Sequence, residues 1–144
     1  RMRIMKKKFT LSNYVDYDFS LIGICSQEED FKLCFFLNQA LQLDFERIRD
    51  IEILLPKQGN MVSFSCFEYT DLDSDLSWYL IANRHPASNL LPDQKQTDYL
   101  LRIVGEQELI DTTQLVNQIK EIPCVLTAFV IPPQDVKNIE NILL

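Results

Sequence analysis

Alternating apolar and polar positions in the middle of the chain predict a run of antiparallel strands. The pattern is clearest in MVSFSCFEY, where Val62, Phe64 and Cys66 fall on one side and serines fall on the other. A period of two is typical of a strand with one buried face. The same period predicts strands over residues 51–55 and 76–84. The intervening KQGN and DLDSD segments predict turns, so these three strands form a meander.

The segment NLLPDQKQTDYLLRIVG, residues 89–105, predicts a turn followed by another strand. Pro92 fixes its own φ angle and biases the preceding residue towards extended backbone, which is typical of a turn. From residue 97 the period is two. The two faces of the strand then carry Thr97, Tyr99, Leu101 and Ile103 on one side and Asp98, Leu100, Arg102 and Val104 on the other. The strand is expected to end at Gly105.

Residues 17–25 predict the first strand, and the SQEED sequence after it predicts the start of a helix. Gly23 inside the strand indicates a bulge or a close backbone approach. Ser26 and Glu29 have the spacing of a capping box, in which each side chain bonds to the other residue's amide. The helix body, FKLCFFLNQALQL, is apolar on more than one face. We expect burial within the monomer, with a seam shared by a second subunit as the alternative.

The last third of the chain predicts a helix, a strand and a second helix. Asp111, with Gln114 three residues on, indicates a helix start, and Pro123 ends that helix. Residues 124–131, CVLTAFVI, are apolar on both faces, which predicts a central strand buried on both sides. Residues 132–144 predict a short C-terminal helix that begins with proline.

These elements together predict an α+β fold. The order is strand, helix, a strand meander, then strand, helix, strand and helix. The simplest packing is a mainly antiparallel sheet of about five or six strands, with two or three helices mostly on one face. At 144 residues the chain is long enough for one domain, which we place over residues 9–144.

Charge is distributed unevenly along the chain. Five of the 14 basic residues lie in the first eight positions, and none of the 21 acidic residues does. The acidic body repels phosphate backbones, so we expect no nucleic acid to bind through it. We interpret residues 1–8 as a basic, flexible N-terminal arm. Because residue 1 is Arg, the native start is expected at Met2 or Met5.

Signals for export and for membrane insertion are missing from the sequence. The basic start is followed by FTLSNYVDYDF, which is polar and acidic where a signal peptide is continuously apolar. No apolar run approaches the roughly 18 residues of a membrane-spanning helix. The four cysteines, Cys25, Cys34, Cys66 and Cys124, form no C-x-x-C pair, so we interpret them as buried, reduced thiols. These features predict a cytoplasmic protein with no membrane partner.

The sequence also lacks the residue sets of several common sites. Its three glycines are tens of residues apart, so they cannot form a phosphate-binding loop. A histidine metal cluster is impossible with the single His85, which we interpret as a loop residue. DLDSD resembles the start of a calcium loop, but Leu76 and Ala82 stand where that loop needs glycine and a bidentate carboxylate. We expect no metal and no cofactor.

Carboxylates are the remaining candidates for chemistry, and Asp93 and Asp98 lie close to Tyr99 in the sequence. One hypothesis is acid–base catalysis near these two carboxylates. However, Tyr99 is on the apolar face of its predicted strand, so its hydroxyl points away from Asp98. We favour a structural contact in which Asp98 bonds to Lys95 or Arg102. The protein is therefore predicted not to be an enzyme.

Residues 91–99, LPDQKQTDY, resemble the motif of the IPExxxVDY family of small bacterial proteins. The positions that match outright are Pro92, Asp98 and Tyr99. The mild departures are Leu91 for Ile, Asp93 for Glu and Thr97 for Val. The stretch DFSLIGICSQEEDFKLCFFLNQALQLDF is similar to the family's opening strand and helix, and the resemblance covers nearly the whole chain. It implies a standalone domain and carries over no activity, cofactor or catalytic residue.

The sequence predicts a small adaptor or regulator that acts by binding another protein, with a second copy of itself included among the partners. The absent catalytic sets, the acidic body and the strongly apolar helix support this hypothesis. The candidate interaction residues are Pro92, Asp93, Lys95, Asp98, Tyr99 and Arg102. One alternative is a small-molecule binding domain with a pocket between sheet and helices, lined by residues such as Trp78, Tyr79 and Tyr99. Nucleic-acid binding through the N-terminal arm is a further alternative.

Overall fold

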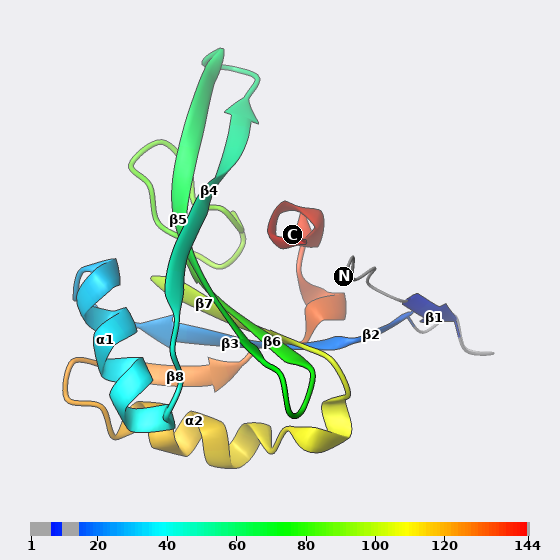
Figure 1. The fold of residues 1–144 in the computed structure, drawn as a ribbon. Helices are drawn as coiled ribbons and strands as arrows, with labels where there is room; N and C mark the ends of the chain where they lie inside the picture. The colour runs from blue at the N-terminus through cyan, green and yellow to red at the C-terminus, as the bar shows by residue number, and fades with distance from the viewer. Residues whose placement is uncertain (1–6, 10–14, 144) are drawn as a thin grey trace.

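The computed structural model describes residues 7–9 and 15–143, and side chains from residue 17 onward. Within that part of the chain, one antiparallel sheet has the strand order β4-β5-β6-β7-β3-β8 (Figure 1). The strands are β3 (Phe19–Cys25), β4 (Glu46–Leu55), β5 (Asn60–Asp71), β6 (Leu76–Ala82), β7 (Tyr99–Val104) and β8 (Thr127–Val130). Two short strands, β1 (Lys7–Phe9) and β2 (Val15–Tyr17), pair separately. The predicted α+β fold with a mainly antiparallel sheet is confirmed.

The helices divide between the two faces of the sheet (Figure 1). α1 (Asp30–Leu41) and α2 (Thr112–Lys120) cover one face, which we call the helix side. Three 3-10 turns are also present among the described residues: η1 (Gln107–Leu109), η2 (Pro133–Asp135) and η3 (Ile139–Ile142). η3 and the residue that follows η2 pack on the opposite face.

Two apolar clusters, one on each face, account for the packing of the sheet. The helix-side cluster joins α1 and α2 to one face of β6 and β7. The opposite cluster joins the C-terminal turns to the other face of the same strands and to β5. Every residue of β7 is buried, because β7 is flanked by β6 and β3 and covered above and below. The faces predicted for residues 62–66, 76–82 and 99–104 are confirmed.

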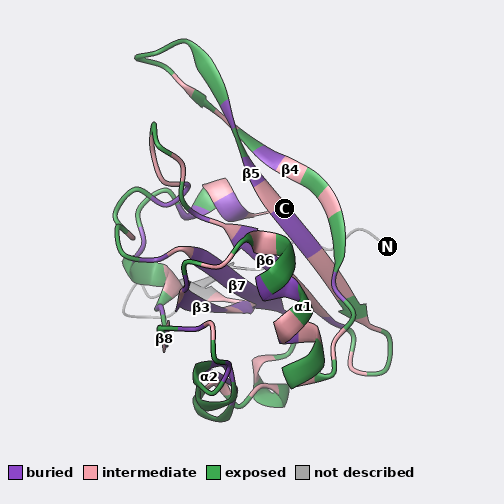
Figure 2. Ribbon diagram, turned by 90° about the vertical axis from the view of Figure 1, so that its left-hand side faces the viewer, coloured by how far each residue is buried: buried purple, intermediate pink, exposed green. Residues whose placement is uncertain are grey.

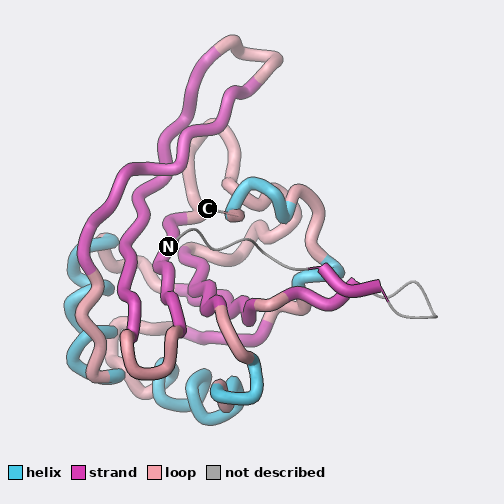
Figure 3. Tube along the Cα trace, turned by 45° about the vertical axis from the view of Figure 1, so that its right-hand side comes forward, coloured by secondary structure: helices cyan, strands magenta, loops and turns pink. Residues whose placement is uncertain are grey.

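The β4–β5 hairpin extends beyond the core and curves away from the helices (Figures 1 and 3). Its outer end is largely exposed (Figure 2). The pairing register shifts between Ile48 and Ile51, and such irregularities bend a strand and increase its twist. Gly59 has φ +65° at the tip, as the predicted turn requires.

The predicted capping box of the first helix is wrong. α1 begins at Asp30, its N-cap is Glu29, and no side chain caps it. Ser26 is buried instead, where its hydroxyl donates to the Cys124 carbonyl at 2.7 Å and accepts from the Glu28 amide at 3.1 Å. Tertiary contact with the loop before β8 therefore takes the serine away from the helix. The cap predicted at Asp111 is confirmed, since its carboxylate accepts from the amide of Gln114.

Two predictions for the last third of the chain are wrong. β8 is not central; it is the last strand of the sheet and pairs with β3 on one side. Its sequence is apolar on both faces because the apolar clusters on both sides of the sheet reach β8. This pattern does not predict which strands lie beside it. The C-terminal helix is replaced by η2 and η3, because Asn138 between them is left-handed at φ 59° and interrupts the helical path.

For two other predictions, the structure describes or confirms only a part. Residues 1–6 of the predicted basic arm lie outside the described residues, and Lys7 and Lys8 belong to β1. All four cysteines are free thiols, as expected, but Cys25 and Cys124 are only half-buried. None of the helices described here is long and apolar enough to cross a membrane.

Candidate functional site

The segment between β6 and β7 is held in place by the fully buried side chain of Asn83. Its Nδ2 donates to the carbonyls of Gln94 at 3.0 Å and Thr97 at 2.8 Å. Its Oδ1 accepts from the amide of Leu91 at 2.8 Å. The predicted turn at Pro92 is confirmed, since the Gln94 amide donates to the Leu91 carbonyl. The three side-chain bonds fix this turn and hence the point at which the motif enters β7.

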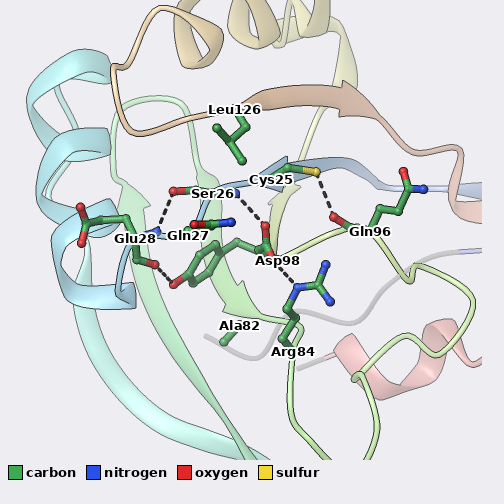
Figure 4. A pocket seen from close by; sticks show the side chains of 10 residues that line it. Cys25, Ser26, Gln27, Glu28, Ala82, Arg84, Gln96, Asp98 and Leu126 are labelled. Atoms are coloured by element: carbon green, nitrogen blue, oxygen red, sulfur yellow. Dashed lines mark hydrogen bonds and ion pairs between the residues drawn. The ribbon is translucent and has the colours of Figure 1, made fainter.

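Asp98 joins three elements at this end of the sheet (Figure 4). One carboxylate oxygen pairs with Nε of Arg84, which follows β6. The other oxygen accepts from the amide of Ser26, which follows β3, at 2.8 Å. The predicted contact with Lys95 or Arg102 is wrong. Arg84 and Ser26 follow the two strands that flank β7, and they are 14 and 72 residues from Asp98 in the sequence. Sequence periodicity gives no information about contacts over such separations.

Tyr99 lies on the helix side, as predicted, and is buried. Its hydroxyl donates to the carbonyl of Glu28 in the segment before α1. Burial, followed by the negative charges of Asp30 and Asp98, raises the pKa of Tyr99 to about 12. The phenol is therefore protonated at neutral pH and acts as a tether between β7 and the start of α1.

A hollow of about 560 Å³ opens beside this network (Figure 4). Its lining comes from the ends of β3 and β6 with the segments that follow them, from the start of β7 with the segment before it, and from the residue before β8: Cys25, Ser26, Gln27, Glu28, Ala82, Arg84, Gln96, Asp98, Tyr99 and Leu126. The Cys25 thiol donates to the Gln96 carbonyl at 3.0 Å, and burial, followed by the charge of Asp98, raises its pKa. Since the Cys25 thiol and the Tyr99 hydroxyl already donate to main-chain carbonyls, the half-exposed guanidinium of Arg84 is the group of this lining best placed to bind a small polar molecule.

The other candidate residues lie away from this hollow. Pro92 and Lys95 are exposed, and Asp93 accepts from the amide of Lys137 at 3.2 Å near the C-terminal turns. Asp93 and Asp98 are therefore not brought together in one pocket. Arg102 is buried on the opposite face of β7, with its guanidinium carbon 4.6 Å from the ring centroid of Phe19. Of the six candidates, only Asp98 and Tyr99 line the hollow.

The predicted pocket of three aromatic rings is wrong. Trp78 and Tyr99 pack on the helix side, whereas Tyr79 packs on the opposite face. The rings separate because neighbouring residues of a strand point to opposite faces. Tyr79 lines a second hollow, also of about 560 Å³, between β4 and η3.

The outer surface of α1 carries two exposed phenylalanines. Phe31 and Phe35 are one helical turn apart and are 55% and 56% exposed, while Leu33 and Leu37 face the core. The expectation that the monomer buries both apolar faces of this helix is therefore wrong for Phe31 and Phe35. This surface could be expected from the helix body FKLCFFLNQALQL, which has more apolar positions than one buried stripe needs.

Asn83 and Arg84 were missed by the sequence reasoning. Both stand in the polar stretch NRHPASN, where a buried asparagine has the same local signature as a solvated one. Among residues 17–143, no group of three His, Cys, Asp or Glu side chains is placed to hold a metal ion.

Comparison of the chain with protein-family models, with curated proteins and with solved structures found no match. The resemblance to the IPExxxVDY family therefore stays a prediction that depends on residues 91–99 and on the opening strand and helix.

Proposed function

We propose that the protein is a small, non-enzymatic cytoplasmic adaptor or regulator that binds another protein through the outer face of α1. The observation that carries this proposal is the pair Phe31 and Phe35, each more than half exposed and one turn apart. Aromatic side chains dominate protein–protein binding energy when they enter a partner's pocket. Side chains at positions i and i+4 are also the anchors of a helix that lies in an apolar groove.

The charge around this surface defines the partner further. Glu28, Glu29 and Asp30 lie at the start of α1, next to Phe31. An acidic rim beside an apolar centre favours a partner whose groove is apolar inside and basic at its edge. The proposed partner is therefore a protein with an aromatic-accepting groove flanked by lysine or arginine.

The experiment is affinity purification of the tagged protein from its own cells, followed by calorimetry with the purified partner. The test variant is Phe31→Ser/Phe35→Ser, and the matched control is Leu72→Ser/Leu109→Ser, which removes two other exposed apolar side chains. We expect the test variant to lose at least about tenfold in affinity and the control to bind normally. Equal binding by all three proteins, or no reproducible partner, would contradict the proposal. Circular dichroism verifies that both variants are folded.

A second candidate function is small-molecule binding in the hollow beside Asp98. The half-exposed guanidinium of Arg84, held by Asp98 at the mouth of the hollow, favours a ligand with a carboxylate or phosphate group. A thermal-shift screen with such metabolites tests it, because a bound ligand raises the melting temperature. Stabilisation that Arg84→Gln abolishes supports this function, and a screen without any stabilising compound contradicts it.

A further inference from the structure

The outer edge of β8 has no strand beside it in the described part of the chain. The Ile131 amide donates to the Leu21 carbonyl at 2.8 Å, so residue 131 directs its backbone groups towards β3. Backbone direction alternates along an antiparallel strand, and Phe129 opposite Gly23 therefore also faces β3. The amide and carbonyl groups of Ala128 and Val130 consequently point outward. Figure 2 shows β8 at the margin of the sheet.

The two edges of the sheet differ in how well they are protected. β4, at one edge, carries charged residues along its length and a register shift in the middle. Charges and irregular pairing are the devices by which proteins prevent strand addition at an edge. By contrast, the ten residues from Pro123 to Pro132 include no charged side chain. Leu126 and Val130 in this stretch are 70% and 47% exposed. The β8 edge therefore has the features of a pairing surface.

The backbone of the β8 edge is self-complementary about Ala128. Leu126 lies just before β8, and its amide donates to the Cys25 carbonyl at 2.8 Å, so its backbone is turned towards β3. An antiparallel pair of β8 strands with its two-fold axis at Ala128 places Thr127 of each copy opposite Phe129 of the other. The outward amide and carbonyl of Ala128 then bond to those of the other Ala128. A two-fold interface requires this kind of self-matching surface.

We propose that β8 pairs antiparallel with β8 of a second copy, which joins two sheets into one continuous sheet across a two-fold axis. The surface is separate from Phe31 and Phe35 on α1, so the dimer proposal does not depend on the adaptor proposal. No charge is brought against a like charge within the paired strands, since neither strand has one.

Sedimentation equilibrium of the full chain, over a range of concentrations, tests the dimer. The test variant is Val130→Lys, which places a charge on the exposed, uncharged edge strand, and the control is Leu72→Lys at a turn where the side chain is 90% exposed. We expect the native protein and the control to dimerise, and Val130→Lys to weaken dimerisation by about tenfold or more. The Phe31→Ser/Phe35→Ser variant should dimerise normally.

A second measurement locates the interface. Amide hydrogen exchange at Ala128 should slow as the native protein is concentrated through the dimerisation range, because this amide gains a partner. A native protein that remains monomeric would overturn the proposal. So would a dimer that Val130→Lys leaves intact, or exchange at Ala128 that does not depend on concentration.

Discussion

At the scale of single residues, the arrangement of the candidate site depends most on a side chain that carries no charge. The side chain of Asn83 supplies hydrogen-bond partners to three backbone groups in the segment before β7. Leaving a buried backbone donor or acceptor without a partner costs about 1–3 kcal/mol. Asn83→Ala should therefore lower the free energy of unfolding by about 2–4 kcal/mol in urea denaturation, with partial hydration of the vacated groups keeping the loss below the full sum.

The matched control for this prediction is Asn89→Ala in the same segment. Asn89 is half-buried and its Nδ2 makes a single bond of 3.3 Å to Gln94. Its removal should cost less than about 1 kcal/mol. If the two variants lose the same stability, the segment is held by something other than the three bonds of Asn83.

The free energy of unfolding depends on pH in the alkaline range because the protein buries thiols. Burial, followed by the charge of Glu68, raises the pKa of Cys66 to about 12 from its ordinary value of 9.0. The unfolded thiol therefore ionises first, and the stabilisation is complete below pH 9 and is lost as the pH rises from 9 towards 12. One such group contributes a slope of about 1.4 kcal/mol per pH unit inside that window.

Cys66→Ala should accordingly show a shallower fall in unfolding free energy with pH than the native protein. Urea denaturation at several pH values above 9 measures the slope. Val62→Ala serves as control, because Val62 lies on the same buried face of β5 and has no ionisable group. It should be less stable at every pH yet keep the native slope. Identical slopes for Cys66→Ala and the native protein would contradict this account.

At the scale of elements, the contact between β3 and β8 depends on a missing side chain. A Cβ at Gly23 would lie 2.8 Å from Cε2 and 2.9 Å from Cζ of Phe129, and 3.0 Å from Cδ1 of Ile131. The predicted bulge or close backbone approach at this glycine is wrong, because its close neighbours are side chains and the strand register through it is regular. Gly23→Ala should cost about 1–3 kcal/mol of stability, because the ring of Phe129 must move out of a packed position.

A double-mutant cycle tests whether that ring is the cause. In the background of Phe129→Leu, Gly23→Ala should cost at least about 1 kcal/mol less than it does alone. Gly59→Ala is the control: no atom lies within 4 Å of its added Cβ, and its cost comes from the left-handed φ of +65°. Phe129→Leu should leave the cost of Gly59→Ala unchanged. If Gly23→Ala lost as much stability in the Phe129→Leu background as alone, the strain would come from elsewhere in β3.

Elements also show how far sequence reasoning reaches in this chain. Periodicity predicted the buried faces of β5, β6 and β7 because the side-chain direction of a strand is local. The same reasoning failed for β8, because apolar residues on both faces of a strand do not show which strands lie beside it. β8 is the last strand of the sheet, and its Thr127 and Val130 are exposed. The partner of Asp98 was likewise out of reach. Arg84 and Ser26 are brought to it by strand order, which is a property of the whole sheet.

At the scale of the whole molecule, the sheet divides into a deep centre and a projecting end. β7 is buried along its whole length and paired on both sides. The outer part of the β4–β5 hairpin, around Leu54 and Met61, is exposed, and in the described part of the chain its two strands pair there with each other alone. Packing is the main source of resistance to local opening, so stability should be distributed unevenly between these two regions.

Native-state hydrogen exchange measures this distribution directly. The amides of Leu100, Leu101 and Ile103 should exchange only through global unfolding, with an opening free energy equal to that from urea denaturation. Those at Leu54 and Met61 should open locally at a cost at least about 2 kcal/mol lower, with little dependence on added urea. The work should be done at low protein concentration, so that pairing at β8 adds no protection. If the hairpin amides matched those of β7, the projecting end would open only with the rest of the sheet, and the division into two regions would not exist.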